Sequence, residues 1–427
     1  MKSKINCGKM KNMEKDEKID NSRDHKKLGK ELGIFTFSDT VGKGLPLWLP
    51  KGATIRRELE RFIIDEEIRR GYLHVRTPDI AKLELYKKSG HYPHYKDSMY
   101  APIVIDDEEF MLRPMTCPHH FELYLSSPHS YRELPIRIAE LAQLYRYEQS
   151  GELMGLQRVR SFCLADAHII CKDEEQAVEE IGKALDLIEY VTSVFNLKLD
   201  EDYRYRLSLG DRNNTQKYYK NDEAWEKGED LLRKLMQNRG SKFEEAKDEA
   251  AFYGPKIDIQ MKNVNGKEDT AFTVQYDFCM PSKFNLNYMG EDGKDHLAFV
   301  VHRSSVGAIE RIMAFLIEKY AGAFPLWLSP VQVKVIPVRT NHNEYAKKVY
   351  ELLKENNIRA ELDDVEANLG GKVRDAKTNK IPYWIVIGDK EIEAGKITLE
   401  SRDAGQLGQM SKEELVIKLL EEIKNKK

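Results

Sequence analysis

Apolar residues recur at helical spacing between residues 54 and 70, and this pattern predicts an amphipathic helix. The residues that share its apolar face are Ile55, Leu59, Phe62 and Ile63. Gly71 follows as a C-terminal stop signal, and residues 72–76 then predict a strand that is closed by Pro78.

Two strand-like stretches, residues 137–148 and 158–171, flank a polar loop that contains Gly151 and Gly155. A helix is predicted next over residues 173–195. The later expected elements are strands at 256–261, 270–277 and 296–302 and a helix at 307–320. Strands that follow strands, with helices between groups of them, predict a mostly antiparallel α+β domain over residues 25–325.

Pro325 and Pro330 bracket a predicted linker, after which short strands and helices alternate. The expected strands are 331–338, 359–362, 383–387 and 396–399, and the expected helices are 345–355, 373–378 and 411–424. This rhythm predicts a smaller α/β domain over residues 330–427. At the other end, residues 1–24 lack apolar periodicity and predict a disordered basic tail, with Asp24 capping a short helix that runs to Leu32.

Composition adds a cellular setting to this organisation. The 427 residues are too many for a single core, and 41% hydrophobic with 33% charged residues is typical of a soluble protein. No apolar run approaches the roughly 20 residues that span a bilayer. The five cysteines are scattered singly without a CxxC pair, which favours a reducing cytoplasm. The net charge of −3 argues weakly against binding of nucleic acid by bulk attraction, although a local basic face remains compatible.

The most informative segment is Arg146-Tyr147-Glu148, followed by Arg158 and Phe162. The first arginine would neutralise charge on a phosphoryl oxygen, and the second would hold distal phosphates. Glu148, expected on the same strand face as Arg146, would accept from an amino group, and Phe162 offers a flat face for a base. On these residues alone, a surface ion pair on a hairpin is the favoured alternative.

Three motifs in order resemble those of the class II aminoacyl-tRNA synthetases. The helix of 54–71 with its strand ending at Pro78 resembles motif 1, the Arg146–Phe162 segment motif 2, and Gly307 with Arg311 motif 3. Four further segments resemble threonyl-tRNA synthetases: 113–120 (RPMTCPHH), 166–168 (DAH), 251–256 (AFYGPK) and 301–303 (VHR). The resemblance implies a class II antiparallel sheet flanked by helices, followed by an anticodon-binding domain.

The resemblance also implies that Cys117, His168 and His302 hold one zinc ion per subunit. An apolar pocket separates threonine from valine only about a hundredfold. Zinc with three protein ligands keeps an open position that the amino and hydroxyl groups of threonine can fill. Asp166 and Tyr253 match family positions that hydrogen-bond threonine. Taken singly, a buried free cysteine and two internally bonded histidines are the alternative.

The expected activity is that of a threonine–tRNA ligase, in which threonine attacks ATP and the threonyl group then passes to its tRNA. The resemblance places Arg146 between the threonine carboxylate and the α-phosphate, and Arg158 and Arg311 on the outer phosphates with Mg²⁺. Gln275 matches another residue of the ATP site. His91 matches a histidine near the terminal ribose hydroxyl of tRNA; a loop histidine without a role is its alternative.

Residues 330–427 resemble the anticodon-binding domain that several class II synthetases share. Glu391 fits an acid that binds a base, and the family's anticodon-binding arginine falls at Glu400 here, with Arg402 nearby. The basic residues Lys372, Arg374, Lys377 and Lys380 form either a tRNA-binding cluster or a solvated helix face. Motif 1 implies a homodimer.

Two departures from the family alter the expectations. Only a short tail precedes the expected catalytic domain, so we expect a short form without the domains that edit seryl-tRNA. Such a protein would attach some serine and rely on a separate editing factor. Leu164 stands two residues before Asp166, where we expect a polar residue in many relatives, so the fine geometry of the threonine pocket is open.

Three rival interpretations stay open: a synthetase for another amino acid such as proline, a non-catalytic RNA-binding paralogue, and a zinc hydrolase. Zinc content would separate the first from a threonyl enzyme. The intact motif arginines disfavour the second, and the lack of an HExxH-like arrangement disfavours the third.

Overall fold

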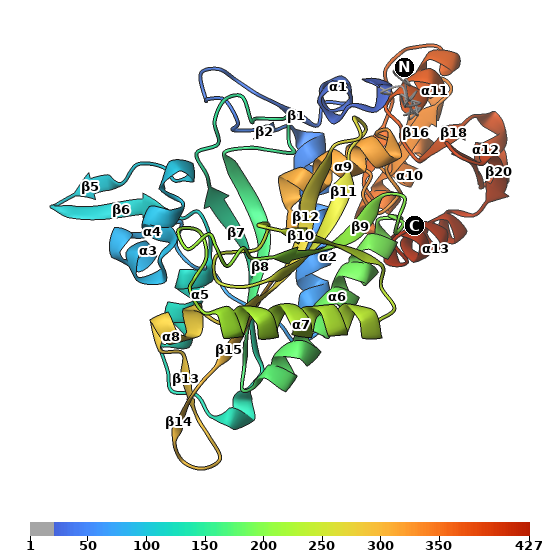
Figure 1. The fold of residues 1–427 in the computed structure, drawn as a ribbon. Coiled ribbons are helices and arrows are strands. Elements are labelled where there is room, and N and C mark those ends of the chain that lie inside the picture. Colours follow the sequence, from blue (N-terminus) through green and yellow to red (C-terminus); the bar gives the residue numbers. More distant parts are fainter. Residues whose placement is uncertain (1–20) are drawn as a thin grey trace, which may run out of the picture.

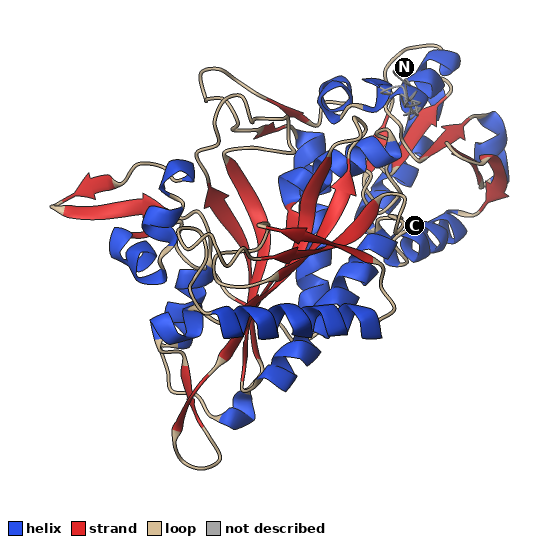
Figure 2. Cartoon of the chain, viewed as in Figure 1, coloured by secondary structure: helices blue, strands red, loops and turns tan. Residues whose placement is uncertain are grey.

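A computed structural model describes residues 21–427, and a twisted sheet of eight strands forms its centre (Figures 1 and 2). The strand order is β10-β9-β11-β12-β15-β8-β7-β3. The six inner strands are β9 (Tyr203–Leu209), β11 (Lys256–Lys262), β12 (Glu268–Asp277), β15 (Phe299–Ala308), β8 (Ser161–Cys171) and β7 (Ile136–Tyr145). They pair antiparallel, while the edge strands β10 (Phe243–Lys247) and β3 (Leu73–His74) pair parallel. The predicted antiparallel α+β class is therefore confirmed.

Helices cover one face of this sheet, and a single hydrophobic core lies between the two layers. The helices that contribute to it are α2 (Pro50–Arg69), α6 (Glu174–Val194), α7 (Asp222–Asn238) and α9 (Ile309–Tyr320). The predicted helix of 54–70 begins four residues earlier, because Pro50 is well suited to the first helical turn. Asp173 caps α6 by accepting from the amide of Gln176, as helix-forming sequences commonly arrange.

Strand β8 shows how the sequence separates core from cavity. Its residues Cys163, Ala165, Ala167 and Ile169 belong to the helix-side core. The alternate residues Phe162, Leu164, Asp166 and His168 line a cavity on the opposite face. Because side chains alternate across a strand, the same apolar pattern that buries one face presents a mixed set on the other.

Smaller elements surround the cavity face. A three-stranded sheet consists of β4 (Ile80–Lys82), β5 (Ile103–Ile105) and β6 (Glu108–Leu112). The short helices nearby are α3 (Leu83–Ser89), α4 (His91–His94), α5 (Cys117–Tyr124) and α8 (Met280–Phe284), and a hairpin is formed by β13 (Asn287–Met289) and β14 (Asp295–Leu297). In Figure 1 the β5–β6 and β13–β14 hairpins project away from the body.

The structure corrects several predicted boundaries. β7 ends at Tyr145, so Arg146 and Glu148 lie beyond the strand and do not share a strand face. Arg158 likewise precedes β8. Gly307 does not open the following helix but lies near the end of β15 with φ +67°, and α9 begins at Ile309. A Cβ at Gly307 would lie 2.1 Å from the carbonyl oxygen of Ala271, so the close approach of the two strands requires glycine there.

At the N-terminal side, residues 1–20 lie outside the described part of the chain, and with them most of the predicted tail and Cys7. Asn21–Arg23 form a 3-10 turn (η1). The predicted helix to Leu32 is confirmed as α1 (His25–Glu31), and Asp24 caps it by accepting from the amide of Lys26. A two-stranded ribbon of β1 (Phe35–Thr36) and β2 (Leu47–Trp48) follows.

The C-terminal part forms a second sheet with its own hydrophobic core. The strand order is β17-β16-β18-β19-β20, where β16 (Val333–Pro337), β17 (Ala360–Leu362) and β18 (Tyr383–Ile387) are parallel and β19 (Ile397–Ser401) and β20 (Gly405–Met410) antiparallel. Its helices are α10 (Asn343–Glu355), α11 (Leu369–Thr378), α12 (Asp389–Ala394) and α13 (Lys412–Lys424). The predicted α/β alternation is confirmed; α12 and β20 were not predicted. No helix within residues 21–427 is long and apolar enough to cross a membrane.

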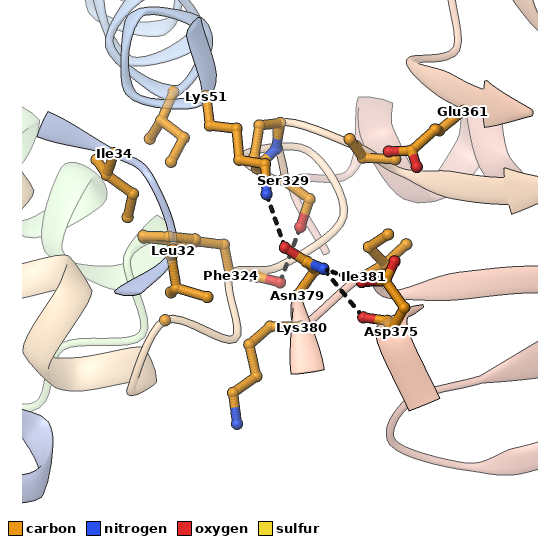
Figure 3. A pocket seen from close by; sticks show the side chains of 14 residues that line it. Leu32, Ile34, Lys51, Phe324, Ser329, Glu361, Asp375, Asn379, Lys380 and Ile381 are labelled. Atoms are coloured by element: carbon orange, nitrogen blue, oxygen red, sulfur yellow. Dashed lines mark hydrogen bonds between the residues drawn. The ribbon is translucent and has the colours of Figure 1, made fainter. Parts of the chain in front are cut away.

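The segment between the two sheets is buried. Trp327 is 2% exposed and contacts the rings of Phe62 and Phe195 at centroid distances of 5.4 and 6.4 Å. Arg359 donates to the carbonyl oxygens of Trp327 and Ser329. Beside this segment lies a cavity of about 260 Å³, where Lys51 donates to Asn379 across the junction (Figure 3). The junction is thus a packed interface and not a free linker.

We expect Trp327→Ala to lower the free energy of unfolding by about 3–5 kcal/mol, because it removes a buried indole from both ring contacts. Urea denaturation of the whole chain measures this loss. Val365→Ala is the matched control, since Val365 is 68% exposed, and it should change stability by less than about 0.5 kcal/mol. An equally small effect of both changes would contradict the packed junction.

Candidate active site

A cavity of about 760 Å³ opens on the sheet face opposite the large helices. Every residue predicted for the catalytic, ATP, threonine and metal sites lines it: His91, Cys117, Arg146, Glu148, Arg158, Phe162, Asp166, His168, Tyr253, Gln275, His302 and Arg311. These residues come from sequence positions more than two hundred apart, and the sheet gathers them. Glu391 and Arg402 lie in the C-terminal domain.

The deep end of the cavity holds Cys117, His168 and His302, whose ligand atoms all lie within 4.8 Å of one another. Cys117 begins α5, while His168 and His302 are direct partners in the antiparallel β8–β15 ladder. All three are buried. Strand register therefore brings the two histidines together and α5 adds the cysteine, which gives a compact Cys/His/His set, a common ligand set for zinc.

Each histidine of this set is fixed by a second partner. His302 Nε2 lies 2.7 Å from a carboxylate oxygen of Asp277, and His168 Nδ1 lies 2.8 Å from His120 Nδ1. His120 Nε2 lies 3.3 Å from Glu140, whose carboxylate can only accept when it is ionised. The proton on His120 is then at Nε2, so His120 Nδ1 accepts from His168. This leaves His302 Nδ1 and His168 Nε2 for a metal ion.

Glu140 is held ionised by its surroundings. Burial alone would raise its pKa, but hydrogen bonds from His120 and Thr77 and the charge of Arg113 lower the pKa of Glu140 to about 2. Arg113 lies 3.1 Å from Glu140 and both side chains are fully buried. Sequence reasoning missed Asp277, His120 and Glu140 as partners of the ligands; Asp277 could have been noticed, since it follows Gln275 at the spacing of one strand face.

The pKa shifts of His168 and Cys117 are compatible with a cation beside them. Burial lowers the pKa of His168 well below its usual value, so its imidazole is neutral with a free lone pair. Burial raises the pKa of the Cys117 thiol well above its usual value, and Asp166 and Asp277 add to this effect. A thiolate at this position therefore requires a nearby cation, which a bound metal ion supplies.

Next to the metal set lies a polar wall. Asp166 accepts from the hydroxyl of Thr116, and burial raises the pKa of this carboxyl. Tyr253 donates to the side-chain oxygen of Gln275 at 2.5 Å, and its ring stacks on His302 at 4.7 Å. A partly buried carboxylate without a charged hydrogen-bond partner gains most from a ligand that brings an ammonium group.

The other end of the cavity gathers arginines. Arg146 lies over the ring of Phe162 at 5.2 Å, and Arg311 donates to the carbonyl oxygens of Gln157 and Thr270. Burial, and then repulsion from Arg146 and Arg158, lower the pKa of Arg311 against the opposing charge of Asp269. Three arginines that converge at one end of a cavity form a binding site for a polyanion.

The predicted ion pair between the two motif 2 residues exists, but it lies at this cavity. Arg158 Nε donates to Glu148 at 2.9 Å, and the side chain of Arg158 is 44% exposed. Because the arginine of this pair is exposed to solvent, a phosphate could replace Glu148 as the partner of Arg158 at little cost. Leu164, the predicted departure from the family, packs with Phe162 and Ala308 as an apolar wall between the two ends.

His91 lies deeper than a loop residue would. It is 2% exposed, its Nδ1 lies 2.8 Å from the Ser89 hydroxyl, and its Nε2 lies 3.8 Å from the sulfur of Cys117. Burial, with the charges of His302 and Lys283, lowers the pKa of His91 to about 3. Its imidazole is therefore neutral at physiological pH, and its role in transfer stays a prediction.

The predicted anticodon residues make internal contacts. Glu391 accepts from the amide of Gly388 and the hydroxyl of Thr398, and so caps α12. Arg402 donates to the carbonyl oxygens of Lys380 and Phe324. Their tRNA roles stay predictions. Glu400 accepts from the indole of Trp384 at 2.9 Å.

The predicted basic cluster of the C-terminal domain loses one member. Lys372 is 6% exposed and donates to the carbonyl oxygens of Asp363 and Pro337. The sequence pattern placed it on a surface because helical spacing alone does not show which face packs on the sheet.

Comparison with known proteins gives consistent matches. The family model of the tRNA synthetase class II core domain (G, H, P, S and T) matches residues 100–320, and that of the anticodon binding domain matches residues 332–422. A threonine–tRNA ligase of Geobacillus kaustophilus is 50% identical over 406 residues, which are 95% of this chain and 62% of that protein. One from Listeria welshimeri is 52% identical over 378 residues, 88% of this chain and 58% of that protein. The chain thus spans about three fifths of the length of these curated relatives.

Two solved structures are similar over almost their whole length. The RNA binding domain of threonyl-tRNA synthetase from Cryptosporidium parvum superposes with a TM-score of 0.88 at 34% identity, covering 93% of this chain and 98% of that one. A putative threonyl-tRNA synthetase from Aeropyrum pernix gives a TM-score of 0.83 at 28% identity, covering 94% and 96%.

We expect Asp277→Asn to weaken zinc binding about 10–100-fold, because the amide orients His302 less firmly and withdraws the negative charge behind it. Competition with a chromophoric chelator measures the affinity. Asp292→Asn is the control: Asp292 makes a similar pair with His296 at 2.8 Å, but on an exposed hairpin away from the cavity. Equal zinc affinity of both variants would contradict the assigned ligand set.

Proposed function

The chain belongs to the class II tRNA synthetase family, within its threonyl branch, and we propose that it has threonine–tRNA ligase activity. The proposed reaction joins threonine to ATP, releases pyrophosphate, and then passes the threonyl group to the 3′ end of its tRNA. The observation that carries the proposal is a single cavity with a Cys/His/His set at one end and converging arginines at the other.

The metal end accounts for selection of the amino acid. Zinc held by Cys117, His168 and His302 would supply an open coordination position for amino and hydroxyl groups. Asp166 would accept from the ammonium group, and Tyr253 would close the pocket over it. Valine carries a methyl group in place of the hydroxyl, and an apolar pocket alone would separate the two only about a hundredfold.

The arginine end accounts for activation. Arg146 would lie between the threonine carboxylate and the α-phosphate, while Arg158 and Arg311 hold the outer phosphates that carry Mg²⁺. The carboxylate oxygen forms a bond to the α-phosphorus, and the bond to the pyrophosphate oxygen breaks. No general base is required, because the carboxylate is already ionised at neutral pH. Phe162 would stack on the adenine, Glu148 would accept from its amino group, and Gln275 would contact the adenylate.

In the transfer step the terminal ribose hydroxyl of tRNA attacks the threonyl carbonyl and AMP leaves. We place His91 beside this hydroxyl, and its neutral imidazole suits it to accept a hydrogen bond. Glu391 and Arg402 are proposed to face the anticodon. We also propose a homodimer through α2 and β3, where Ile68 and Leu73 are 54% and 60% exposed.

The decisive experiment is ATP–pyrophosphate exchange on zinc-loaded protein with threonine, serine, valine and proline in parallel. We expect strong exchange with threonine, weaker exchange with serine because it shares the amino and hydroxyl pair, and almost none with valine. Removal of zinc with a chelator should abolish the preference for threonine over valine. Exchange with proline alone, or with none of the four, would overturn the proposal.

A second expectation concerns the proposed bridging arginine. Arg146→Gln should lower kcat for exchange about 10²–10³-fold, because a charged donor at the reacting phosphate is lost. The KM for threonine should change much less, since the metal end is untouched. Arg132→Gln, an exposed arginine outside the cavity, is the control and should leave kcat unchanged. A similar kcat in both variants would rule out this role for Arg146.

A further inference from the structure

Helix α1 packs beneath the loop that carries Glu148 and Arg158, and a single imidazole connects the two. His25 is the first residue of α1 and is 2% exposed. Its Nδ1 lies 2.6 Å from Glu318 on α9, and its Nε2 lies 3.2 Å from the backbone nitrogen of Leu156. Residues 25, 156 and 318 thus meet at one buried ring.

The hydrogen-bond roles at this ring are unambiguous. A backbone N–H can only donate, so His25 Nε2 accepts from Leu156 and carries no proton. The ring proton is then on Nδ1 and is donated to Glu318. The other carboxylate oxygen of Glu318 accepts from the amide of Val264 at 3.0 Å. Both ring nitrogens are satisfied by a neutral imidazole in one tautomer.

The loop closes tightly around this imidazole. Gly155 has φ +51°, and a Cβ there would lie 2.2 Å from His25 Nε2. On the other side of the turn, the Gln157 carbonyl accepts from Arg311 at 3.0 Å, and its side chain accepts from Asn263 at 3.2 Å. Hydrogen bonds to His25 on one side and Arg311 on the other therefore hold the turn of residues 155–157 in place.

We propose that His25 is a positioning residue for ATP binding, which rests on the proposed function. Arg158 directly follows the turn of residues 155–157, and Arg311 donates a hydrogen bond to the Gln157 carbonyl of that turn. Fixing residues 155–157 therefore fixes the relative placement of two arginines that must face one polyphosphate. Such preorganisation is effective, because displacement of a binding group by about 1 Å can cost up to a hundredfold in rate.

Two substitutions, each of which retains the hydrogen-bond role of one ring nitrogen, separate this role from simple packing. Asn places an amide nitrogen near His25 Nδ1, so His25→Asn keeps the donor to Glu318 and loses the acceptor for Leu156. Gln places an oxygen near Nε2, so His25→Gln keeps the acceptor and loses the donor. We expect His25→Asn to raise the KM for ATP about tenfold in pyrophosphate exchange, with the KM for threonine unchanged. His25→Gln should lower the melting temperature while keeping the KM for ATP near that of the parent.

The control is His296→Asn, a change of the same kind in the exposed pair with Asp292. Two readouts need no activity: ATP affinity by equilibrium dialysis without threonine, and hydrogen exchange of the Leu156 amide. The affinity for ATP and the protection of the Leu156 amide from exchange should both fall in His25→Asn, and in neither of the other two variants. Absence of threonine-dependent exchange in the parent protein would reject the proposed function but leave these two readouts valid. The positioning role is wrong if ATP affinity and Leu156 protection in His25→Asn match those of the parent. It is also wrong if His25→Asn and His25→Gln lose them equally.

Discussion

The pairing of β8 with β15 is the constraint on which the cavity depends. Their antiparallel register sets His168 opposite His302 and Asp166 opposite Ser304. A shift of one residue would turn every one of these side chains to the helix side, because strand side chains alternate. The register is secured on that side, where Ala165, Ala167 and Ile169 pack into the apolar core. The geometry of the cavity on one face is thus specified by hydrophobic packing on the other.

Strand β15 also links the cavity to α2, the helix that we propose for dimerisation. Arg303, next to His302, lies 2.5 Å from Glu67 of α2, and both side chains are buried. Burial alone would raise the pKa of Glu67, but the charge of Arg303 and hydrogen bonds from His74 and Ser305 lower it. An ion pair in this setting is costly to break, because either partner alone would be an uncompensated buried charge. A movement of α2 would therefore displace Arg303 and, with it, the neighbouring His302 on β15.

The sequence predicted those elements whose structure is determined by local periodicity, and failed where contacts between distant segments determine it. Local periodicity predicted α6, α2 and β8, whose apolar residues recur over many positions. It placed Arg146 and Glu148 on a strand that ends at Tyr145, because no residue there interrupts the pattern; Arg146 instead bonds to Arg160 and Pro114 in the folded chain. The amphipathic α7 was overlooked although its helix is long.

Site residues were harder to predict from local pattern alone. The metal set came from resemblance, since no spacing in the sequence reveals a strand register. The partners of its histidines are set by packing between β7, β12 and α5. Asp277 could be noticed from its spacing to Gln275, but nothing in the sequence separates His120 and Glu140 from other histidines and glutamates. Lys372 illustrates the reverse error: a residue in a basic run was assigned to the surface, whereas tertiary packing buries it against two carbonyl groups.

The residue spacing of strand β8 gives the separation between the two ends of the proposed binding site. Its cavity face presents Phe162, Leu164, Asp166 and His168 in order, and successive residues of one face lie about 6.6 Å apart on a strand. The nucleotide end at Phe162 and the amino-acid end at Asp166 are therefore roughly 13 Å apart, with Leu164 between them. The mixed anhydride of the proposed reaction would form beside Leu164. In the proposed reaction an apolar side chain there would exclude water from a bond that water hydrolyses, which is a physical rationale for the predicted departure from the family.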